Sequence, residues 1–327
     1  MKSIIGQSLA KSQIEKILSG DRGHVFLITG ASGIGKKTFA RKLAKGLLCQ
    51  SPDIDGACGI CTLCRYFDEN VNPDFKSLTI PSGERGIKVE SVRSGICADV
   101  SVLPQFSSKK VYLIEGDGLN EQGQNALLKT LEEPPPGVYF LITGKDTSLF
   151  LPTIISRSQV IPLYPNSEDE VISVLKSKLD ISEEEAVLYA RFSEGIPGRA
   201  IELASSEWFK DLRDESANIF FRIPKLTKTT LLTEIYRFFE DRKENTNEIL
   251  IIWQFLLRDL LFLKFKQDKN KLRNTDFSLD INKVMGLWTE EQIENAGAVL
   301  IRCFAALKAN CSFESSICSM LLTFHKS

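Results

Sequence analysis

The sequence has no excess of charge of either sign, because 41 basic and 42 acidic side chains leave a net charge of −1 over 327 residues. A chain that binds nucleic acid by itself usually carries a clear positive excess, so this balance argues against an autonomous nucleic-acid binder. No stretch reaches the ~20 apolar residues of a membrane span, and residues 1–6, MKSIIG, have no signal-peptide core. These absences predict a cytoplasmic protein that does not enter a membrane. Its length predicts two or three domains.

Four of the eight cysteines lie close together, in two C-x-x-C steps with a fourth cysteine upstream. In a cytoplasmic protein, metal binding or reduced thiols are expected before disulfides. Four soft thiolates suit tetrahedral Zn²⁺, which folds a segment too short for a core of its own. We therefore predict a structural zinc site in an insertion at 49–64; an iron–sulfur cluster, redox cysteines and unliganded cysteines are the alternatives. The predicted ligands are Cys49, Cys58, Cys61 and Cys64, and the other cysteines, Cys97, Cys303, Cys311 and Cys318, are expected to be buried apolar residues.

Residues 30–38, GASGIGKKT, lie between an apolar strand at 24–29 and a helical pattern at 39–48. This context of strand, glycine-rich turn and helix is that of a phosphate-binding loop, or P-loop. The glycines let backbone N–H groups surround an anion, the helix N-terminus adds positive charge, and the lysine reaches the outer phosphates. The predicted nucleotide-binding residues of this loop are Gly30, Gly33, Gly35, Lys36, Lys37 and Thr38.

Two positions depart from the pattern of a hydrolysing ATPase. Lys37 stands where a Ser or Thr hydroxyl would bind Mg²⁺, and Thr38 is one step late, ~100° away around the helix. The strand that ends at Glu115 stands where an Asp-Glu pair would hold the metal and polarise the attacking water. Gly116 has no side chain for that second task, and Asp117 is expected to be a solvated turn residue. The loop therefore has the form of a P-loop, but its capacity for hydrolysis is in doubt.

Further apolar strands alternate with helical patterns over the first half of the chain. The strands are predicted at 75–80, 111–115, 138–143 and 159–163, and the helices between them include 8–19 and 89–100. This alternation predicts a parallel sheet that is covered on both faces. Ahead of the first helix, residues 4–7, IIGQ, either cover an adenine base or simply pack on the sheet.

The alternation stops at Ser167, where acidic residues mark a helix start. A second helix starts at Ser182 and a third near residue 195. Arg199, in this third helix, either faces a nucleotide phosphate or pairs with Glu202. From residue 208 the pattern is wholly helical, and the helix at 249–265 is apolar on most sides, which is typical of a buried element.

Five segments carry a resemblance to the bacterial clamp-loader ATPase family. They are IGQ at 5–7, the P-loop, the four-cysteine insertion, NALLKTLEEPP at 125–135 and SRS at 156–158. The resemblance is continuous from about residue 1 to 205, and beyond that only the helical character agrees. It implies an α/β P-loop (AAA+) domain at 1–165 with the zinc insertion at 49–64, a helical lid at 166–207 and an all-α collar for oligomerisation at 208–327. It also implies that the third helix, with Arg199, is the sensor-2 segment of the lid.

Within this family, hydrolysing subunits keep the two groups that are missing at positions 37 and 116. Arg157, by contrast, is retained in the serine–arginine motif that reaches a neighbour's ATP. The resemblance thus implies a non-hydrolysing subunit that supplies Arg157 in trans to a ring of gamma/tau and delta subunits, which opens a sliding clamp and places it on primed DNA. The implied cofactors are structural Zn²⁺ and ATP at the neighbour's site, with nucleotide in the chain's own loop left open. A self-sufficient gamma/tau-type ATPase is the alternative, and a zinc-bearing nucleic-acid binding module is a third.

Overall fold

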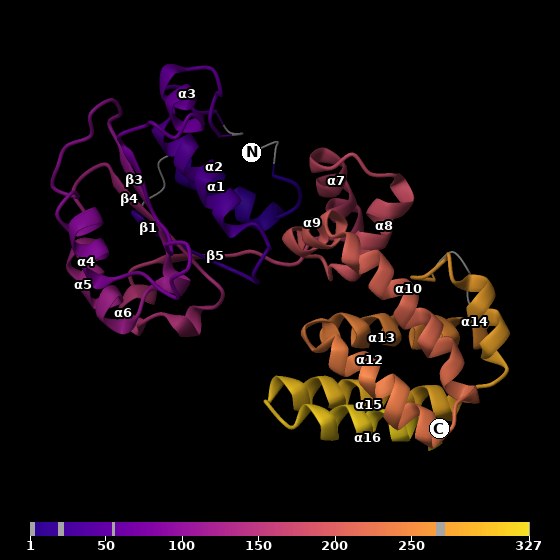
Figure 1. Cartoon of the computed structure of the whole chain (residues 1–327). Helices are drawn as coiled ribbons and strands as arrows, with labels where there is room; N and C mark the ends of the chain where they lie inside the picture. The colour runs from indigo at the N-terminus through magenta and orange to yellow at the C-terminus, as the bar shows by residue number, and fades with distance from the viewer. Residues whose placement is uncertain (1–3, 19–22, 54–55, 266–271, 327) are drawn as a thin grey trace. The chain divides into compact units, whose positions relative to one another are not determined.

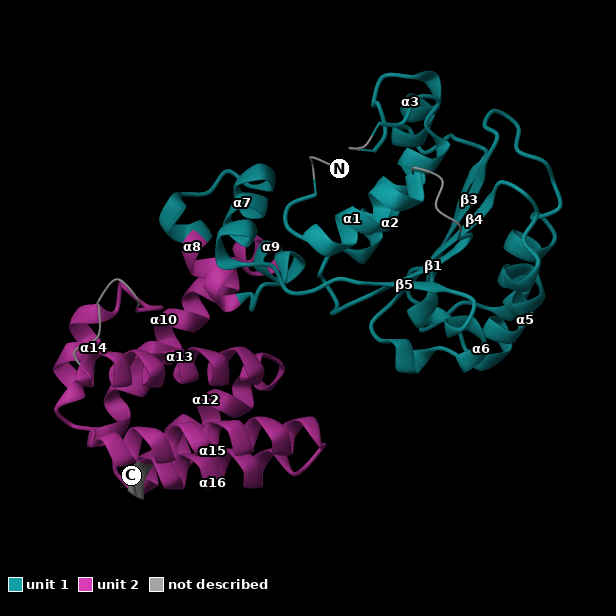
Figure 2. Cartoon of the chain, turned by 180° about the vertical axis from the view of Figure 1, so that it is seen from behind, with its two compact units in different colours: residues 1–186, 193–201 teal, residues 187–192, 202–327 magenta. Residues whose placement is uncertain are grey.

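The computed structural model describes residues 4–18, 23–53, 56–265 and 272–326. The chain divides into two compact units, residues 1–186 with 193–201, and residues 187–192 with 202–327 (Figure 2). Within the described ranges, no helix combines the length and the apolar character that crossing a membrane requires. The predicted boundaries at 165 and 207 are not tested by these units and stay predictions.

The first unit is built on five parallel strands in the order β2-β3-β4-β1-β5. Their bounds are β1 Val25–Thr29, β2 Phe75–Leu78, β3 Lys110–Glu115, β4 Val138–Gly144 and β5 Gln159–Pro162. In the register, the last residue of β1, Thr29, lies beside Gly144 of β4 and Pro162 of β5. The glycine-rich loop therefore leaves the sheet between two neighbouring strands, at their carboxyl ends.

Helices cover both faces of this sheet (Figure 1), which confirms the predicted arrangement. On one face lie α1 (Ser8–Leu18) and α2 (Lys36–Leu48); on the other lie α4 (Val89–Val92), η1 (Arg93–Cys97), α5 (Glu121–Glu132) and α6 (Pro152–Ile155). Side chains alternate along β1, so that Phe26 and Ile28 join the first layer while Val25 and Leu27 join the second. The helix predicted at 89–100 is present from Val89 to Cys97, where one α-helical turn continues as the π-helical turn η1.

Three further helices follow the sheet: α7 (Glu168–Lys178), α8 (Glu183–Phe192) and α9 (Pro197–Ser205). The start of α7 is fixed by a capping box. The Ser167 hydroxyl accepts from the Glu170 N–H at 3.2 Å, and the Glu170 carboxylate accepts from the Ser167 N–H at 3.0 Å. The helix start predicted at Ser167 is therefore confirmed.

Every described element after residue 207 is helical, as the sequence predicts. The longer helices of this unit are α10 (Glu207–Arg222), α12 (Tyr236–Asp241), α13 (Thr246–Lys264), α14 (Ser278–Met285), α15 (Glu290–Lys308) and α16 (Phe313–Lys326). Helix α13 is buried on most sides, and its Trp253 packs against Phe220, Phe239 and Phe324. Of the cysteines predicted to be buried, Cys303 is buried and Cys97 and Cys318 are half-buried, but Cys311 is exposed, because it lies in the turn between α15 and α16.

Candidate functional site

The glycine-rich loop has the backbone of a phosphate cradle. Gly30, Gly33 and Gly35 have φ angles of 150°, 80° and 102°, a region in which side chains are strained. A Cβ at Gly30 would also lie 2.8 Å from the Leu163 carbonyl oxygen. Since α2 begins at Lys36, the loop leads directly into a helix N-terminus. These features give the loop the anion-binding geometry that the sequence predicts.

Lys36 turns back over this loop. Its ammonium donates hydrogen bonds to the carbonyl oxygens of Gly30, at 2.7 Å, and Ala31, at 3.0 Å. Burial lowers the pKa of Lys36, and the charges of Lys145 and Lys37 add to this, while the Asp117 carboxylate opposes it. Several ammonium groups therefore surround the place where phosphate would bind.

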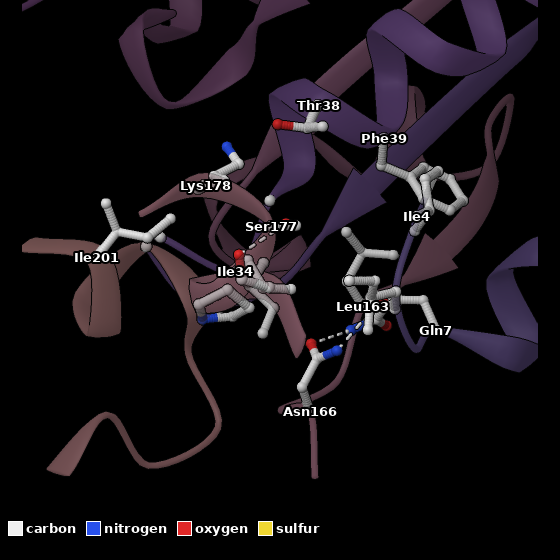
Figure 3. A pocket seen from close by; sticks show the side chains of 16 residues that line it. Ile4, Gln7, Ile34, Thr38, Phe39, Leu163, Asn166, Ser177, Lys178 and Ile201 are labelled. Atoms are coloured by element: carbon white, nitrogen blue, oxygen red, sulfur yellow. Dashed lines mark hydrogen bonds between the residues drawn. The ribbon is translucent and has the colours of Figure 1, made fainter. Parts of the chain in front are cut away.

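A cavity of about 180 Å³ lies beside the loop (Figure 3). Its lining is mainly apolar and comes from the residues ahead of α1, the loop with the start of α2, and helices α7 and α9. Gln7 fixes the first of these segments, because its side-chain N–H group donates to the Tyr164 carbonyl at 2.6 Å and to Asn166 at 3.0 Å. Ile4, Ile5 and Gln7 thus lie along this cavity, and their role over an adenine base stays a prediction.

Helix α9 is in backbone contact with the loop. The Gly198 N–H donates to the Gly33 carbonyl oxygen at 2.9 Å, and a Cβ at Gly198 would lie 2.6 Å from that oxygen. The neighbouring Arg199 pairs with Glu194, at 3.7 Å, rather than with the predicted Glu202. Its role toward a phosphate remains a prediction.

Lys37 and Glu115, at the two positions where a P-loop ATPase has its magnesium ligands, form an ion pair. The Lys37 ammonium lies 2.9 Å from one Glu115 carboxylate oxygen, and the other oxygen accepts from the Ile80 N–H at 3.1 Å. Thr38 lines the cavity instead, so its hydroxyl does not replace the missing one. Mg²⁺ requires several oxygen ligands in octahedral geometry, and an ammonium beside the carboxylate repels a divalent cation. These residues do not fit a bound magnesium ion.

Gly116 has no room for the carboxylate that polarises water in an ATPase. It opens the short turn η2 (Gly116–Gly118), and a Cβ there would lie 2.5 Å and 2.6 Å from ring atoms of Phe150. The same Cβ would lie 2.8 Å from the Thr143 carbonyl oxygen. Phe150 is buried, with 5% of its surface exposed. An aromatic ring therefore fills the place in which a glutamate side chain would begin.

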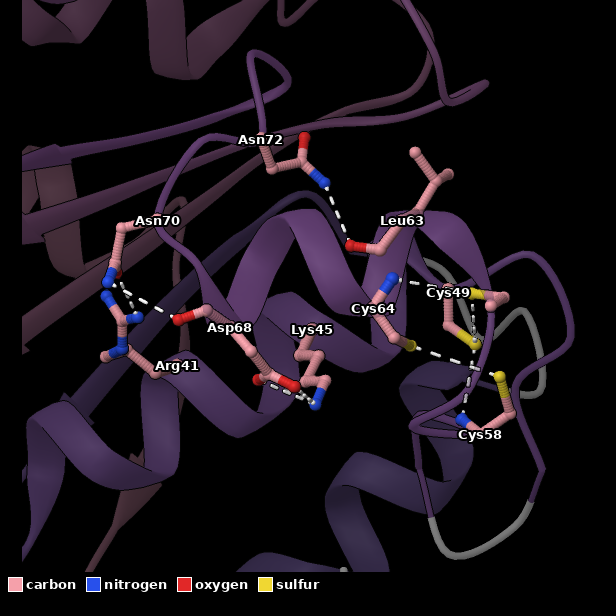
Figure 4. A network of polar contacts seen from close by, with 10 residues as sticks. Arg41, Lys45, Cys49, Cys58, Leu63, Cys64, Asp68, Asn70 and Asn72 are labelled. Atoms are coloured by element: carbon pink, nitrogen blue, oxygen red, sulfur yellow. Dashed lines mark hydrogen bonds and ion pairs between the residues drawn. The ribbon is translucent and has the colours of Figure 1, made fainter.

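The four predicted zinc ligands lie together. Their sulfur atoms are within 4.8 Å of one another, and the distances Cys49–Cys61 and Cys58–Cys64 are both 4.0 Å (Figure 4). Zinc–sulfur bonds of about 2.3 Å place tetrahedral ligands about 3.8 Å apart, so the cluster fits zinc.

Local backbone supports this cluster. Cys49 follows α2 directly, and Cys61 is the N-cap of α3 (Thr62–Asp68), where its sulfur accepts from the Cys64 N–H at 3.4 Å. The Cys58 N–H donates to the Cys49 sulfur at 3.3 Å. Burial raises the pKa of Cys61, but backbone hydrogen bonds with Gln50 and Cys64 outweigh it and lower the pKa to about 6. The backbone thus favours the thiolate, the form that binds metal, at Cys61, whereas burial raises the pKa of Cys49 and Cys64 in the absence of a cation.

Arg157 follows α6 and is engaged within the chain. Its guanidinium donates to the Thr153 carbonyl oxygen at 2.8 Å, so it caps the end of this short helix. A second nitrogen lies 2.6 Å from the Glu132 carboxylate, at the end of α5. One third of the Arg157 side chain is exposed, at 33%. The guanidinium is therefore held in place and still accessible from one side.

The sequence reasoning did not identify the partners of these residues. Phe150 and Glu132 lie 34 and 25 positions from Gly116 and Arg157, and no local pattern marks such a pairing. Glu132 belongs to the quoted EEPP run, so that run was the one available signal for it.

Comparison with known proteins gives a consistent set of relatives. Residues 6–167 match the family described as DNA polymerase III, delta subunit. A DNA polymerase III subunit delta' from Pseudomonas aeruginosa is 38% identical over 143 residues, which are 43% of this chain and 43% of that protein. Subunit delta' from Escherichia coli is 29% identical over 57% of this chain and 55% of that protein. Subunit gamma from Buchnera aphidicola is 38% identical over 54% and 48%. The chain thus spans about half the length of the curated relatives it matches.

Two solved structures from Thermotoga maritima align with nearly the whole chain. A DNA polymerase III gamma subunit-related protein is 16% identical, with a TM-score of 0.43, over 97% of this chain and 99% of that one. A RuvB variant is also 16% identical, with a TM-score of 0.44, over 97% of this chain and 87% of that one. Values this low support no argument about function.

Proposed function

The chain belongs to the DNA polymerase III clamp-loader family, and from this premise we propose that it is a delta-prime-type subunit. In this role it completes a ring of ATPase subunits in the cytoplasm without hydrolysing ATP itself, and it donates Arg157 to the ATP site of a neighbour. Gamma/tau and delta subunits are its direct partners. It meets the sliding clamp and primed DNA through the assembled ring, which acts in DNA replication.

One observation carries the proposal: the chain's own site lacks both groups of the hydrolytic chemistry, whereas Arg157 is kept. Lys37 pairs with Glu115 where magnesium ligands would be, and Phe150 fills the space beside Gly116. A guanidinium is always charged and donates in a planar fork, so it suits the charge on a transferring phosphoryl group. The presence of Arg157 in a chain without its own hydrolytic groups is explained if this arginine serves the ATP site of the neighbour.

The test is Arg157→Ala in the complex with gamma/tau and delta subunits. Arginines that act in trans contribute on the order of 10³–10⁵ in rate, so DNA-stimulated ATP hydrolysis at the adjoining site should fall steeply. Arg157→Lys should rescue poorly, because lysine lacks the fork. Arg85→Ala, at an exposed arginine of the same unit, is the matched control and should leave the rate unchanged.

The competing role for Arg157 is structural, as the cap of α6 and the partner of Glu132. A cap of this kind contributes about 0.3–1 kcal/mol to the free energy of unfolding. If Arg157 has only this role, Arg157→Ala should destabilise the chain slightly and leave ATP hydrolysis by the neighbouring subunit unchanged. Wild-type hydrolysis and clamp loading by the alanine complex would therefore reject the trans role.

A gamma/tau-type ATPase is the second candidate, because the relatives of this chain include subunits named gamma and tau in addition to those named delta'. The isolated chain distinguishes the two. Steady ATP turnover that disappears in Lys36→Ala would favour the active ATPase, whereas the proposed function predicts negligible turnover.

A further inference from the structure

The Lys37–Glu115 ion pair stands where a P-loop enzyme holds its metal ion. We propose that the Lys37 ammonium replaces magnesium in this site, so that the loop binds the phosphates of a nucleoside diphosphate or triphosphate without a divalent cation. This inference deepens the nucleotide site of the proposed subunit, but it does not depend on Arg157.

Two features prevent magnesium from binding beside Glu115: the positive charge of the Lys37 ammonium and, among the described residues, the lack of free oxygen ligands there. Both oxygens of Glu115 already have partners: the ammonium at 2.9 Å and the Ile80 N–H at 3.1 Å. A further carboxylate beside the loop, that of Asp117, is exposed and accepts from the Lys145 backbone N–H at 2.8 Å. Magnesium would have to displace an ammonium from its carboxylate and would still lack the hydroxyl of the usual loop.

The remaining groups suit an anion. The charges of Lys37 and Lys145 act on Lys36 together with the carboxylates of Glu115 and Asp117, and Lys178 also lines the cavity, so lysines outnumber carboxylates among these residues. Among the described residues, the Lys36 ammonium donates to carbonyl oxygens of its own loop, in the bonds described above. Positive-φ glycines and the start of α2 supply N–H donors beside them. The exposed part of Lys37, 55% of its side chain, lets its ammonium turn from Glu115 toward a phosphate.

A nucleotide bound in this way is a structural ligand. The cavity joins the loop to α7, α9 and the segment at 4–7, so that a ligand in it contacts four separate parts of one unit. No side chain at position 116 activates water, so the bound nucleotide stays intact and leaves only by dissociation. The bound nucleotide stabilises the unit by a free energy that rises with the logarithm of the ligand concentration relative to Kd.

The experiment is calorimetric titration of ADP into the isolated, zinc-loaded chain. One series uses buffer without divalent cations, and a second uses excess magnesium chloride; chelators are omitted because they would remove zinc. The wild type should bind ADP at least as tightly without magnesium as with it. Lys37→Thr should weaken metal-free binding roughly tenfold to a hundredfold, the effect of a hydrogen bond between charged groups.

Three further variants make the outcome decisive. Lys36→Ala should abolish binding in both buffers, whereas Lys45→Thr, which removes a lysine of α2 that pairs with Asp68, should bind like the wild type. Glu115→Gln frees the Lys37 ammonium and should bind ADP more tightly, still without a need for magnesium. The inference is overturned if magnesium tightens wild-type binding tenfold or more, or if ADP does not bind in either buffer. Because the neighbouring subunits are absent, neither outcome bears on Arg157.

Discussion

At the residue scale, the packing around Gly116 supports the proposed lack of hydrolysis, in addition to the residues at positions 37 and 116. The ring of Phe150 lies against both Gly116 and Gly144, at the carboxyl ends of β3 and β4. A side chain at either glycine would enter the volume of this ring. A glutamate at position 116 would therefore overlap the Phe150 ring, so this single substitution does not restore the carboxylate in its working position.

We predict that Gly116→Glu gives no ATP turnover and lowers the free energy of unfolding by about 1–3 kcal/mol, the usual effect of overpacking. The physical reason is the contact of 2.5 Å between a Cβ at this position and the Phe150 ring. Urea unfolding and an ATPase assay of the isolated chain measure the two effects. The double variant Gly116→Glu/Phe150→Ala relieves the overlap and should recover part of the stability, and hydrolysis by the single variant would contradict the prediction.

A second residue-scale prediction concerns Asp99, whose carboxylate contacts three side chains. Its carboxylate accepts from Tyr112, Lys76 and Lys110, each at 2.7 Å, and Lys110 is almost fully buried. Burial raises the pKa of Asp99, but Lys110, Lys76 and Tyr112 outweigh it and bring the pKa from 3.8 to about 2. Because the folded value is the lower one, this stabilisation is present above pH 3.8 and is lost as the pH falls toward 2.

Asp99→Asn should therefore destabilise the chain at pH 7 by roughly 3–5 kcal/mol, because Lys110 keeps a buried charge without a counter-ion. The variant should also lose the part of the acid dependence that lies between pH 3.8 and about 2. Urea unfolding at neutral and acid pH measures both effects. The matched control is Asp68→Asn, whose pair with Lys45 lies at the surface and should contribute less than about 1 kcal/mol.

At the element scale, the sequence predicted those helices, strands and turns that are determined by residues close together in the chain. The buried strands, the P-loop and the start of α7 follow from residues adjacent in the sequence, and all three are present. The turn η1 was missed because hydrophobic spacing over one turn does not distinguish an α-helix from a π-helix. The pair Lys37–Glu115 was missed for another reason. Its members lie 78 positions apart, on α2 and β3, so only the folded sheet brings them together.

The zinc segment is the element whose fold depends most on a ligand. In the described parts of this segment, residues 49–53 and 56–61, there is no helix before α3 begins at Thr62, and the four sulfur atoms lie together beside it. We predict about one zinc per chain and a loss of that zinc in Cys61→Ser. Cys97→Ser, a half-buried cysteine outside the cluster, is the matched control. Metal analysis measures the content, and hydrogen exchange should rise in α3 of the first variant only. A zinc-free preparation with normal protection of α3 would reject the site.

At the scale of the whole molecule, the two units have separate cores and different chemistry. The P-loop, the zinc segment and Arg157 all lie in the first unit, whereas the second is wholly helical among the described residues and holds an aromatic core around Trp253. The near-neutral net charge of −1 gives the chain as a whole no strong electrostatic attraction to DNA.

The positions of the tryptophans allow the two cores to be observed separately. All three tryptophans, Trp208, Trp253 and Trp288, lie in the second unit, so their fluorescence reports its unfolding alone. Removal of zinc with a chelator should lower the urea concentration at which the first unit is half unfolded. Hydrogen exchange in β1 and β4 measures this midpoint. The free energy available from zinc has an upper bound of about 10–16 kcal/mol, the value in zinc-finger peptides. The urea midpoint from tryptophan fluorescence should stay unchanged, because the one ligand cluster found among the described residues lies wholly in the first unit. If the two midpoints fall together, the units unfold as one cooperative structure, and the assignment of separate cores is wrong.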